Sequence, residues 1–462
     1  MLKLSVEFKE KYKNLLGEKA AEKMFAAMND NSKKAFRINP LKKVKVSYPL
    51  NERVPDLSNG YYGEISGNDP EWVSGSVYSQ DPSAMFPAHI ANVKPGEKVL
   101  DLCAAPGGKS TGLGEALKGK GVLVANEIST SRAKILRENI ERWGITNALV
   151  TNASPDELVP YFKQYFDKIL VDAPCSGEGM FRKNPEAIEY WSPNYVETCK
   201  LRQQDILTAA IKMLKPGGKI IYSTCTFSPE EDEQIVEWLV KSYSMQILPI
   251  ENITSTKISY GHPEWGSNNS ELTKTLRFWP QDDLGEGQFA ALLKLPDSKT
   301  ETKTGSKKKK KQKKSNFALT NSDKDLIDKV LKRFTLPVPL ANWKEEALVR
   351  NNHVFIPVIN PIEIKGLKIL NNGVELGILK KNRFEPGHQL AEVLGQDKQT
   401  EVIDLTSEDE FLSYLHGETI QVNSPLKGFV LVSYKDMIFS FGKIAGKTLK
   451  NFYPKGLRLL KK

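Results

Sequence analysis

The chain has 462 residues, more than one hydrophobic core usually holds, so we expect a central domain with smaller flanking domains. It contains no N-terminal apolar run suited to a signal peptide and no stretch of roughly 18 apolar residues that could span a membrane. Its four cysteines show neither C-x-x-C spacing nor a partnering His cluster, which argues against a disulfide scaffold and a structural zinc site. We therefore expect a soluble, cytoplasmic protein without a metal, in which any functional cysteine is a free thiol.

The net charge of +10 arises largely from one segment of the chain. Lys307–Lys311, Lys313 and Lys314 lie in a polar stretch, Pro296–Ser315, that has almost no large apolar residues. Without these lysines the rest of the chain carries only about +3. We place a domain boundary in this stretch and interpret it as a linker, with a phosphate-binding arm as the alternative role of the lysines.

Short apolar runs alternate with helical patterns from about residue 95 onward, as in βαβ units around a parallel sheet. The pattern predicts strands at residues 98–103, 121–126, 148–151, 167–171 and 219–224, and helices at residues 131–143 and 196–214. The run Gln288–Leu295 predicts a strand that closes this domain. The predicted fold class is α/β, with a Rossmann-like core.

Elements outside the core are less regular. A helix is expected to begin at Ser228, because this residue offers an N-cap, Pro229 follows at the first helical position and three acids come next. Beyond the polar stretch, residues 326–334 look helical, and residues 428–433 and 437–441 resemble strands separated by Gly and Lys. We expect one or two small mixed or β-rich modules at the C-terminal end.

The first predicted strand runs into a glycine-bearing turn, Ala104-Ala-Pro-Gly-Gly-Lys-Ser110, at the edge where an open α/β sheet binds its ligand. Asp101 ends this strand and can accept hydrogen bonds from a cofactor. Glu127 follows the next strand, where a carboxylate can hold both ribose hydroxyls of an adenosine cofactor. The spacing matches neither G-x-G-x-x-G nor a phosphate loop, which disfavours nicotinamide and nucleoside triphosphates, while a purely structural turn remains the alternative.

Two cysteines follow neighbouring strands of the predicted sheet. Asp172-Ala-Pro-Cys-Ser-Gly-Glu-Gly179 ends the fourth strand, and Ser223-Thr-Cys-Thr226 ends the fifth. Because these strands are usual neighbours, both thiols should face the ligand crevice within several Å of each other. A lone cysteine after a strand is more often buried and inert, and we assign Cys103 and Cys199 to such packing roles.

One aspartate and two thiols suit methylation of a pyrimidine at carbon 5. This carbon is a poor nucleophile until a thiolate adds to carbon 6, and an acid near N3 and a base for the C5 proton complete the reaction. A free thiol with a pKa of about 8.5 is barely ionised at neutral pH, so the nucleophile needs a site that favours the thiolate. The helix expected at Ser228 would point its N-terminus towards Cys225 and favours this residue, and Lys109 can add positive charge.

These segments, with Lys34-Ala-Phe-Arg-Ile-Asn-Pro-Leu-Lys42 and Gln80-Asp-Pro-Ser-Ala-Met85, resemble the Sun/RsmF-type family of RNA 5-methylcytosine methyltransferases. The resemblance covers most of the chain and implies S-adenosylmethionine as the cofactor. It also implies that Cys225 is the nucleophile, that Cys175 assists release of the methylated base, that Asp172 contacts the cytosine near N3 and that Lys109 supports the site. A solvated arginine is the alternative for Arg37, which with Asn39 fits an N-terminal motif of the family.

The resemblance further implies a set of cofactor-binding residues: Asp101, Ala104, Ala105, Pro106, Gly107, Gly108, Lys109, Ser110, Glu127, Arg132 and Asp172. One position departs from the pattern. Where many members carry an aspartate after the third strand, this chain has Thr151-Asn-Ala-Ser154. Asn152 and Ser154 are therefore the candidates for the contact on the adenine side.

The C-terminal stretches Arg383–Gln389 and Lys450–Arg458 are similar to the PUA-like end of RsmF members, and their interleaved aromatics and cations suit RNA backbone contact and base stacking. A β-rich module with ordinary surface lysines is the alternative. The expected domains are an N-terminal RNA-binding domain (1–90), the catalytic domain (91–297), a Lys-rich linker (298–316), an RsmF-type middle domain (317–382) and a PUA-like domain (383–462).

RNA is the expected partner, with 16S rRNA or the small ribosomal subunit favoured and a monomer as the working form. A tRNA cytosine methyltransferase would share every catalytic residue. A catalytically silent RNA-binding assembly factor is disfavoured because both cysteines are present. DNA cytosine methylation is disfavoured because it leaves the Thr-Cys site and the PUA-like tail without a role.

Overall fold

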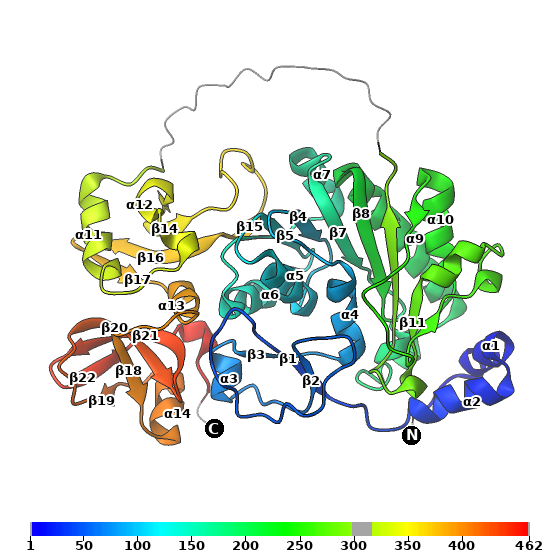
Figure 1. Ribbon diagram of the computed structural model, residues 1–462, viewed down its shortest axis with the longest axis horizontal. Coiled ribbons are helices and arrows are strands. Elements are labelled where there is room, and N and C mark those ends of the chain that lie inside the picture. Colours follow the sequence, from blue (N-terminus) through cyan, green and yellow to red (C-terminus); the bar gives the residue numbers. More distant parts are fainter. Residues whose placement is uncertain (1, 298–316, 461–462) are drawn as a thin grey trace, which may run out of the picture.

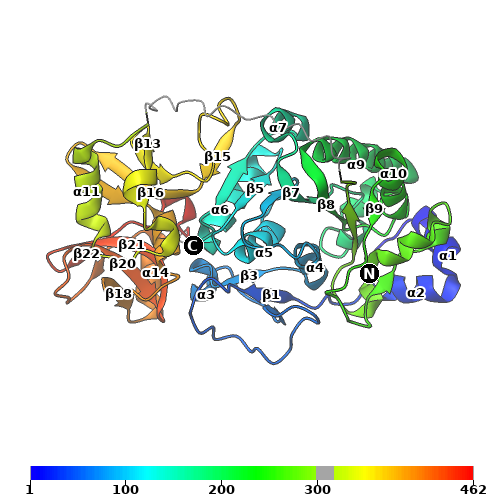
Figure 2. The ribbon, with the colours of Figure 1, turned by 45° about the horizontal axis from the view of Figure 1, so that its top comes forward.

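The computed structural model describes residues 2–297 and 317–460. The lysine run and the expected linker therefore lie outside the described residues. Within the described part of the chain, no helix is long and apolar enough to cross a membrane. Figure 1 shows a central α/β body with the N-terminal helices against one side and the C-terminal modules against the other, and Figure 2 gives the same arrangement from a second direction.

The central sheet contains five parallel strands in the order β6-β5-β4-β7-β8. Their bounds are β4 Lys98–Asp101, β5 Val122–Asn126, β6 Ala148–Thr151, β7 Phe166–Asp172 and β8 Leu214–Thr224. The α/β class and the Rossmann-like core are confirmed. The neighbouring position of β7 and β8, on which the expected meeting of two cysteines depends, is confirmed as well.

Helices cover both faces of this sheet and bury two separate apolar cores. Side chains of α4, α5 and α6 form one core, and side chains of α7, α9 and α10 form the other. The bounds of these helices are α4 Pro82–Ile90, α5 Gly108–Leu117, α6 Thr130–Trp143, α7 Pro155–Phe162, α9 Pro193–Met213 and α10 Glu233–Tyr243. Antiparallel strands extend the β8 edge: β9 Gln246–Ile247, β10 Ser259–Tyr260, β11 Leu276–Phe278 and β12 Gln288–Lys294.

The N-terminal region has two parts. Helices α1 (Val6–Leu16) and α2 (Glu18–Ala27) pack on aromatic residues of the loops that follow β7 and β8, among them Phe181 and Phe227. The rest forms a small sheet in the order β2-β1-β3, with bounds β1 Ala35–Ile38, β2 Gly60–Tyr62 and β3 Val77–Ser79, and the short helix α3 Pro70–Val73. This sheet lies beside α5 and α6 (Figure 2).

The first C-terminal unit contains a four-stranded sheet in the order β13-β14-β16-β17. The bounds are α11 Asn321–Leu331, α12 Trp343–Glu346, β13 Leu348–Arg350, β14 His353–Ile356, β16 Val374–Lys380, β17 Arg383–Pro386 and α13 His388–Leu394. Helix α11 begins earlier than expected because Thr320 and Asp323 form a capping box. The expected boundary at residue 383 falls inside this sheet, since β17 pairs with β16.

One strand of the first C-terminal unit belongs to the central sheet and not to the four-stranded sheet of that unit. Strand β15 (Ile369–Asn372) pairs antiparallel with β6 and so becomes the outermost strand of the catalytic sheet. Sequence patterns did not predict this pairing, because Thr151 and its partner Ile369 are 218 positions apart in the chain.

The last unit is a five-stranded sheet in the order β18-β20-β21-β22-β19. Its elements are β18 Val402–Leu405, α14 Glu408–His416, β19 Ile420–Gln421, β20 Gly428–Tyr434, β21 Met437–Ala445 and β22 Thr448–Asn451. The expected β-rich C-terminal module is confirmed.

The expectation that aromatic residues of the two C-terminal stretches stack on RNA bases is wrong for Phe384 and Tyr453, because both are buried. Tyr453 packs edge-on against His388, and burial lowers the pKa of that histidine to about 3. The cations Arg383, Lys450 and Lys455 are exposed, so backbone contact by these residues stays a prediction.

Candidate active site

A cavity of ≈ 530 Å³ opens at the carboxyl ends of the parallel strands. Expected site residues that line it are Ala105, Glu127, Arg132, Asp172, Cys175 and Cys225. An adjoining cavity of ≈ 220 Å³ shares Ala105 and Asp172 with it and is also lined by the expected residues Asp101, Ala104, Pro106, Gly108 and Lys109. The structure thus brings most of the expected residues to one place.

Cys103 is also part of both cavity walls, although we expected it only to pack. Burial raises the pKa of its thiol, so it remains protonated. Cys199 is buried on α9, as expected of a packing residue.

The thiols of Cys175 and Cys225 lie in contact. Their sulfur atoms are 3.3 Å apart, within hydrogen-bonding distance, and both side chains are partly accessible. The hydrogen bond with Cys225, together with burial, raises the pKa of Cys175 well above its ordinary value. Cys175 therefore stays a thiol that can donate a hydrogen bond to the Cys225 sulfur.

Asp172 stands beside this pair and is held by three donors. Lys109 Nζ lies 2.7 Å from Asp172 Oδ2, while Ser223 Oγ and Gln288 Nε2 lie 2.7 and 3.0 Å from Oδ1. Burial opposes the charge of Lys109, but Asp172 offsets this and leaves the lysine pKa raised. Lys109 is therefore a fixed cation in the site. Sequence reasoning missed Ser223 and Gln288, since a polar residue at a strand end has no distinctive spacing.

The loops that carry the two cysteines brace each other through two buried carboxylates. Glu178, three residues after Cys175, accepts hydrogen bonds from Phe227 N (2.9 Å) and Ser228 Oγ (2.7 Å). Glu231, six residues after Cys225, accepts from Ser176 N (3.0 Å). Each loop thus supplies an acceptor for donors on the other.

Further hydrogen bonds stabilise the contact between the two loops. Glu178 also accepts from Tyr12 of α1 and from Trp191 Nε1 (2.7 Å), and Gly179 N donates to Cys225 O (2.9 Å). Burial of Glu231 raises the pKa of its carboxyl to about 7. Glu178 lies in the Asp172–Gly179 motif and Glu231 in the segment expected to start a helix, but the sequence does not identify their partners because these lie far along the chain.

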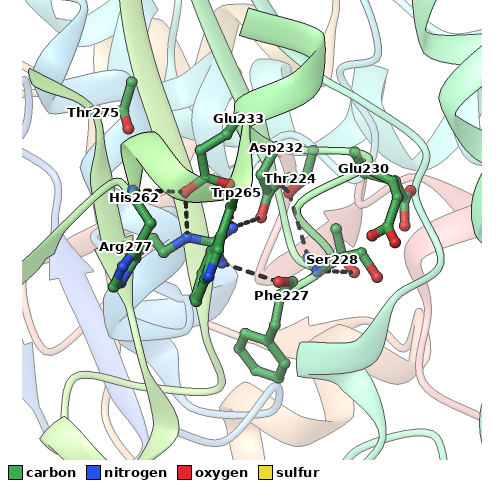
Figure 3. A network of polar contacts seen from close by, with 12 residues as sticks. Thr224, Phe227, Ser228, Glu230, Asp232, Glu233, His262, Trp265, Thr275 and Arg277 are labelled. Atoms are coloured by element: carbon green, nitrogen blue, oxygen red, sulfur yellow. Dashed lines mark hydrogen bonds and ion pairs between the residues drawn. The ribbon is translucent and has the colours of Figure 1, made fainter. Parts of the chain in front are cut away.

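Arg277 of β11 holds the far end of the Cys225 loop (Figure 3). Its guanidinium donates to Phe227 O (3.1 Å) and to Glu233 Oε1 (2.8 Å), and lies 3.1 Å from Asp232 Oδ2. All of these side chains are buried.

The helix expected to start at Ser228 starts instead at Glu233, so that prediction is wrong. Ser228 turns its hydroxyl to Glu178, and Glu231 and Asp232 bind tertiary partners rather than capping a helix. The proposed action of a helix N-terminus on Cys225 loses its basis. Lys109 and the Cys175 thiol are the groups that the structure brings near that sulfur.

The glycine turn offers a cradle for a cofactor. Asp101 is fully buried, and its Oδ2 accepts from Ser110 Oγ (2.6 Å) while its Oδ1 has no hydrogen-bond partner in the protein. Burial raises the pKa of Asp101 to about 7. An unpaired buried carboxylate oxygen at a cavity wall fits a ligand that brings a donor, as the ammonium group of S-adenosylmethionine would.

Arg37 supports this turn from the N-terminal sheet. Its guanidinium donates to Gly108 O (2.8 Å), Gln80 Oε1 (2.8 Å) and Glu115 (2.9 Å) and is buried, so the alternative of a solvated arginine is wrong. Asn39 likewise donates to Gly75 O and Trp143 O. The N-terminal motif therefore fixes the small sheet to the catalytic core.

Glu127 and Arg132 line the larger cavity side by side. Arg132 Nη1 lies 3.5 Å from Glu127 Oε2, and its Nη2 donates to Ala105 O at 2.7 Å. Glu127 Oε1 accepts from Ser129 N (2.8 Å). The remaining acceptor capacity of this carboxylate suits the ribose hydroxyls expected there.

Asn152 and Ser154 line neither cavity. The amide of Asn152 donates to Glu127 O and Ile128 O, and Ser154 caps α7 in a capping box with Glu157. Six residues that sequence reasoning missed also line the larger cavity: Ile128, Pro155, Asp156, Arg202, Asp205 and Ile206. Among the described residues, no group of three or more His, Cys, Asp or Glu side chains could hold a metal ion.

Four family descriptions match successive parts of the chain. Residues 4–82 match the N-terminal domain of 16S rRNA methyltransferase RsmF, and residues 88–294 match 16S rRNA methyltransferase RsmB/F. Residues 331–394 match the RsmF rRNA methyltransferase first C-terminal domain, and residues 401–459 match the methyltransferase RsmF PUA domain.

Curated relatives align with nearly the whole chain. Ribosomal RNA small subunit methyltransferase F of Vibrio vulnificus is 31% identical over 87% of this chain and 85% of its own length. The protein of the same name from Vibrio campbellii is 30% identical over 94% and 93%. Among solved structures, a methyltransferase homolog protein from Pyrococcus horikoshii is 29% identical, covers 62% of this chain and 93% of its own, and superposes with a TM-score of 0.54.

Proposed function

Because the chain belongs to the family of ribosomal RNA small subunit methyltransferase F, we propose that it methylates carbon 5 of a cytosine in 16S rRNA. The family consists of S-adenosylmethionine-dependent RNA methyltransferases. The observation that carries the finer proposal is the 3.3 Å contact between the sulfur atoms of Cys175 and Cys225, beside Asp172 in one cavity. A methyltransferase acting on an exocyclic amine or a ribose hydroxyl would need neither thiol.

The nucleophile in this proposal is Cys225. Its thiolate adds to carbon 6 of the cytosine, which makes carbon 5 enamine-like and able to attack a methyl group. The donor, when bound, supplies that methyl group on an electrophilic sulfonium. Hydrogen-bond donation from Cys175 and the nearby charge of Lys109 support the thiolate before attack.

Asp172 is assigned to the N3 edge of the ring, where its carboxylate accepts a hydrogen bond from the proton that N3 takes up as the thiolate adds, so that no negative charge is left on the ring. Three donors, Lys109, Ser223 and Gln288, keep its carboxylate in one orientation. After methyl transfer, a base must remove the C5 proton so that the C5–C6 double bond reforms and the Cys225 thiolate leaves. We assign assistance in this release to Cys175.

Donor binding is assigned to the cradle around Asp101, the turn Ala104–Ser110, and Glu127 with Arg132. The free acceptor atom of Asp101 and the cavity of ≈ 530 Å³ support this assignment. Asn152 and Ser154 are not direct contacts of the methyl donor in this proposal, because local hydrogen bonds occupy their side chains.

The domain division is part of the proposal: an N-terminal RNA-binding domain, a catalytic domain, a Lys-rich linker, a middle domain and a PUA-like domain. A cytoplasmic location and a monomeric working form belong to it as well. A tRNA substrate stays the alternative within the same chemistry, and the RsmF-type PUA match at residues 401–459 favours 16S rRNA over it.

The test combines two substrates and one readout. The purified chain is incubated with S-adenosylmethionine and either small ribosomal subunits or tRNA, both from cells lacking the protein, and bisulfite sequencing then identifies 5-methylcytosine. We expect methylation at one or a few cytosines of 16S rRNA. Methylation of tRNA alone would replace the substrate, and a methylated position other than carbon 5 would overturn the proposed chemistry.

A further inference from the structure

The C-terminal unit extends the catalytic sheet directly beside the proposed donor site. Strand β15 pairs with β6 through Ile369 opposite Thr151 and Asn371 opposite Val150. The pairing continues one residue further, where Asn152 N donates to Lys368 O at 3.0 Å. The main chain of the C-terminal unit thus fixes the position of Asn152.

Asn152 in turn holds the turn that carries Glu127. Its Nδ2 donates to Glu127 O (2.8 Å) and Ile128 O (2.9 Å), and its Oδ1 accepts from Thr130 Oγ1 (2.8 Å). Both amide hydrogens are used and only 7% of the residue is exposed, so the side chain is a connector rather than a ligand contact.

The side chain of Lys368 adds a second link between β15 and helix α6. Its Nζ lies 3.1 Å from Thr130 Oγ1, the same hydroxyl that donates to Asn152. Thr130 is the first residue of α6, the helix that also carries Arg132 towards the cavity. Backbone pairing and side-chain bonds therefore connect β15 to both Glu127 and Arg132.

We propose that β15 of the C-terminal unit takes part in binding the methyl donor, with Asn152 as the positioning residue that connects it to Glu127. This inference rests on the proposed function, because it takes the cavity beside Glu127 as the donor site. A donor that fixes Glu127 should then stabilise the pairing of β15 with β6, since coupling between two sites is reciprocal.

The first experiment needs no substitution. Amide hydrogen exchange is measured on the full chain with and without S-adenosylhomocysteine. We expect the ligand to slow exchange at residues 368–372 at least severalfold, and to leave Thr448–Asn451 of β22, a strand of the separate C-terminal sheet, unchanged. Equal behaviour of the two segments would overturn the inference.

The second experiment replaces the connector by its isostere. Asn152→Asp keeps the shape and the acceptor for Thr130 but turns a carboxylate towards the carbonyl groups of Glu127 and Ile128. We expect its Kd for S-adenosylhomocysteine, measured by calorimetry, to rise about tenfold, as two lost hydrogen bonds predict. RNA affinity should change less than twofold, which separates this role from a loss of folding.

Asn371→Ala is the matched control, because this β15 residue contacts Glu141 at the far end of α6, away from the cavity. It should bind S-adenosylhomocysteine as the unsubstituted chain does. Unchanged ligand affinity in Asn152→Asp, or an equal loss in the control, would contradict the inference while leaving the proposed function intact. Failure of the unsubstituted chain to bind S-adenosylhomocysteine would overturn both.

Discussion

The sulfur atoms of Cys175 and Cys225 lie 3.3 Å apart, although 50 residues separate them in the chain. This contact exists because parallel strands β7 and β8 are neighbours and each delivers one cysteine just past its carboxyl end. The hydrogen bond between the sulfur atoms, together with burial, raises the pKa of Cys175, so this thiol can donate to its neighbour. The geometry therefore places two adjacent thiols at one edge of the sheet, and their ranking as nucleophile and assistant is part of the proposed function.

Single substitutions of the two cysteines should give opposite products. Cys225→Ala should abolish methyl transfer, because it removes the thiolate that is proposed to add to carbon 6. Cys175→Ala should accumulate a covalent protein–RNA adduct, visible as a shifted band on a denaturing gel after incubation with S-adenosylmethionine and RNA. If Cys225→Ala formed the adduct instead, the roles would be reversed. Cys199→Ser, on the buried face of α9, is the control and should form none.

Glu178→Gln should slow catalysis without weakening RNA binding. Glu178 accepts hydrogen bonds from Phe227 N and Ser228 Oγ, and a glutamine turns a donor towards one of these groups. We expect kcat to fall at least tenfold, as small displacements of a catalytic group do, with KM for RNA within twofold. Glu186→Gln, an exposed substitution on the same segment, should leave both constants unchanged. Equal effects of the two substitutions would remove the positioning role of Glu178.

Asp101 should make the ligand-free protein less stable as pH rises. Burial raises the pKa of Asp101 in the folded protein from 3.8 to about 7. The folded state therefore holds this proton more tightly than the unfolded state, and the resulting contribution to the free energy of unfolding is fully present below pH 3.8 and is lost as pH rises to 7. The loss corresponds to about 4 kcal/mol. Asp101→Asn removes this titration, so thermal melting from pH 4 to 7 should show the Tm of the variant rising relative to that of the unsubstituted chain. Parallel pH curves would exclude the effect.

Glu392→Gln should destabilise the contact between the N-terminal sheet and the C-terminal unit. Glu392 lies 2.5 Å from Lys42 Nζ, and both side chains are buried, so the substitution leaves a buried ammonium without its counter-charge. The expected loss is about 3–5 kcal/mol in urea unfolding. Lys43→Met removes the neighbouring but exposed pair with Asp397 and should cost less than about 1 kcal/mol. A similar cost for both would contradict the buried-pair interpretation.

The sequence by itself determined the α/β core, the neighbouring position of its fourth and fifth parallel strands and the meeting of Asp172, Cys175 and Cys225 at one edge. These features follow from local apolar runs and from the rule that parallel strands end at the same edge of a sheet. The resemblance of Lys34–Lys42 and of the two cysteine motifs added the family and the ranking of the thiols.

Only the tertiary structure decided which groups hold the site in place. Ser228 offered every local sign of a helix start, yet Glu178, Ser176 and Arg277 take the hydroxyl and the acids that would have capped it. Asn152 looked like a ligand contact but is used by the turn beside β15. A polar side chain binds whichever partner folding brings nearest, and partners from distant segments leave no pattern in the neighbouring sequence.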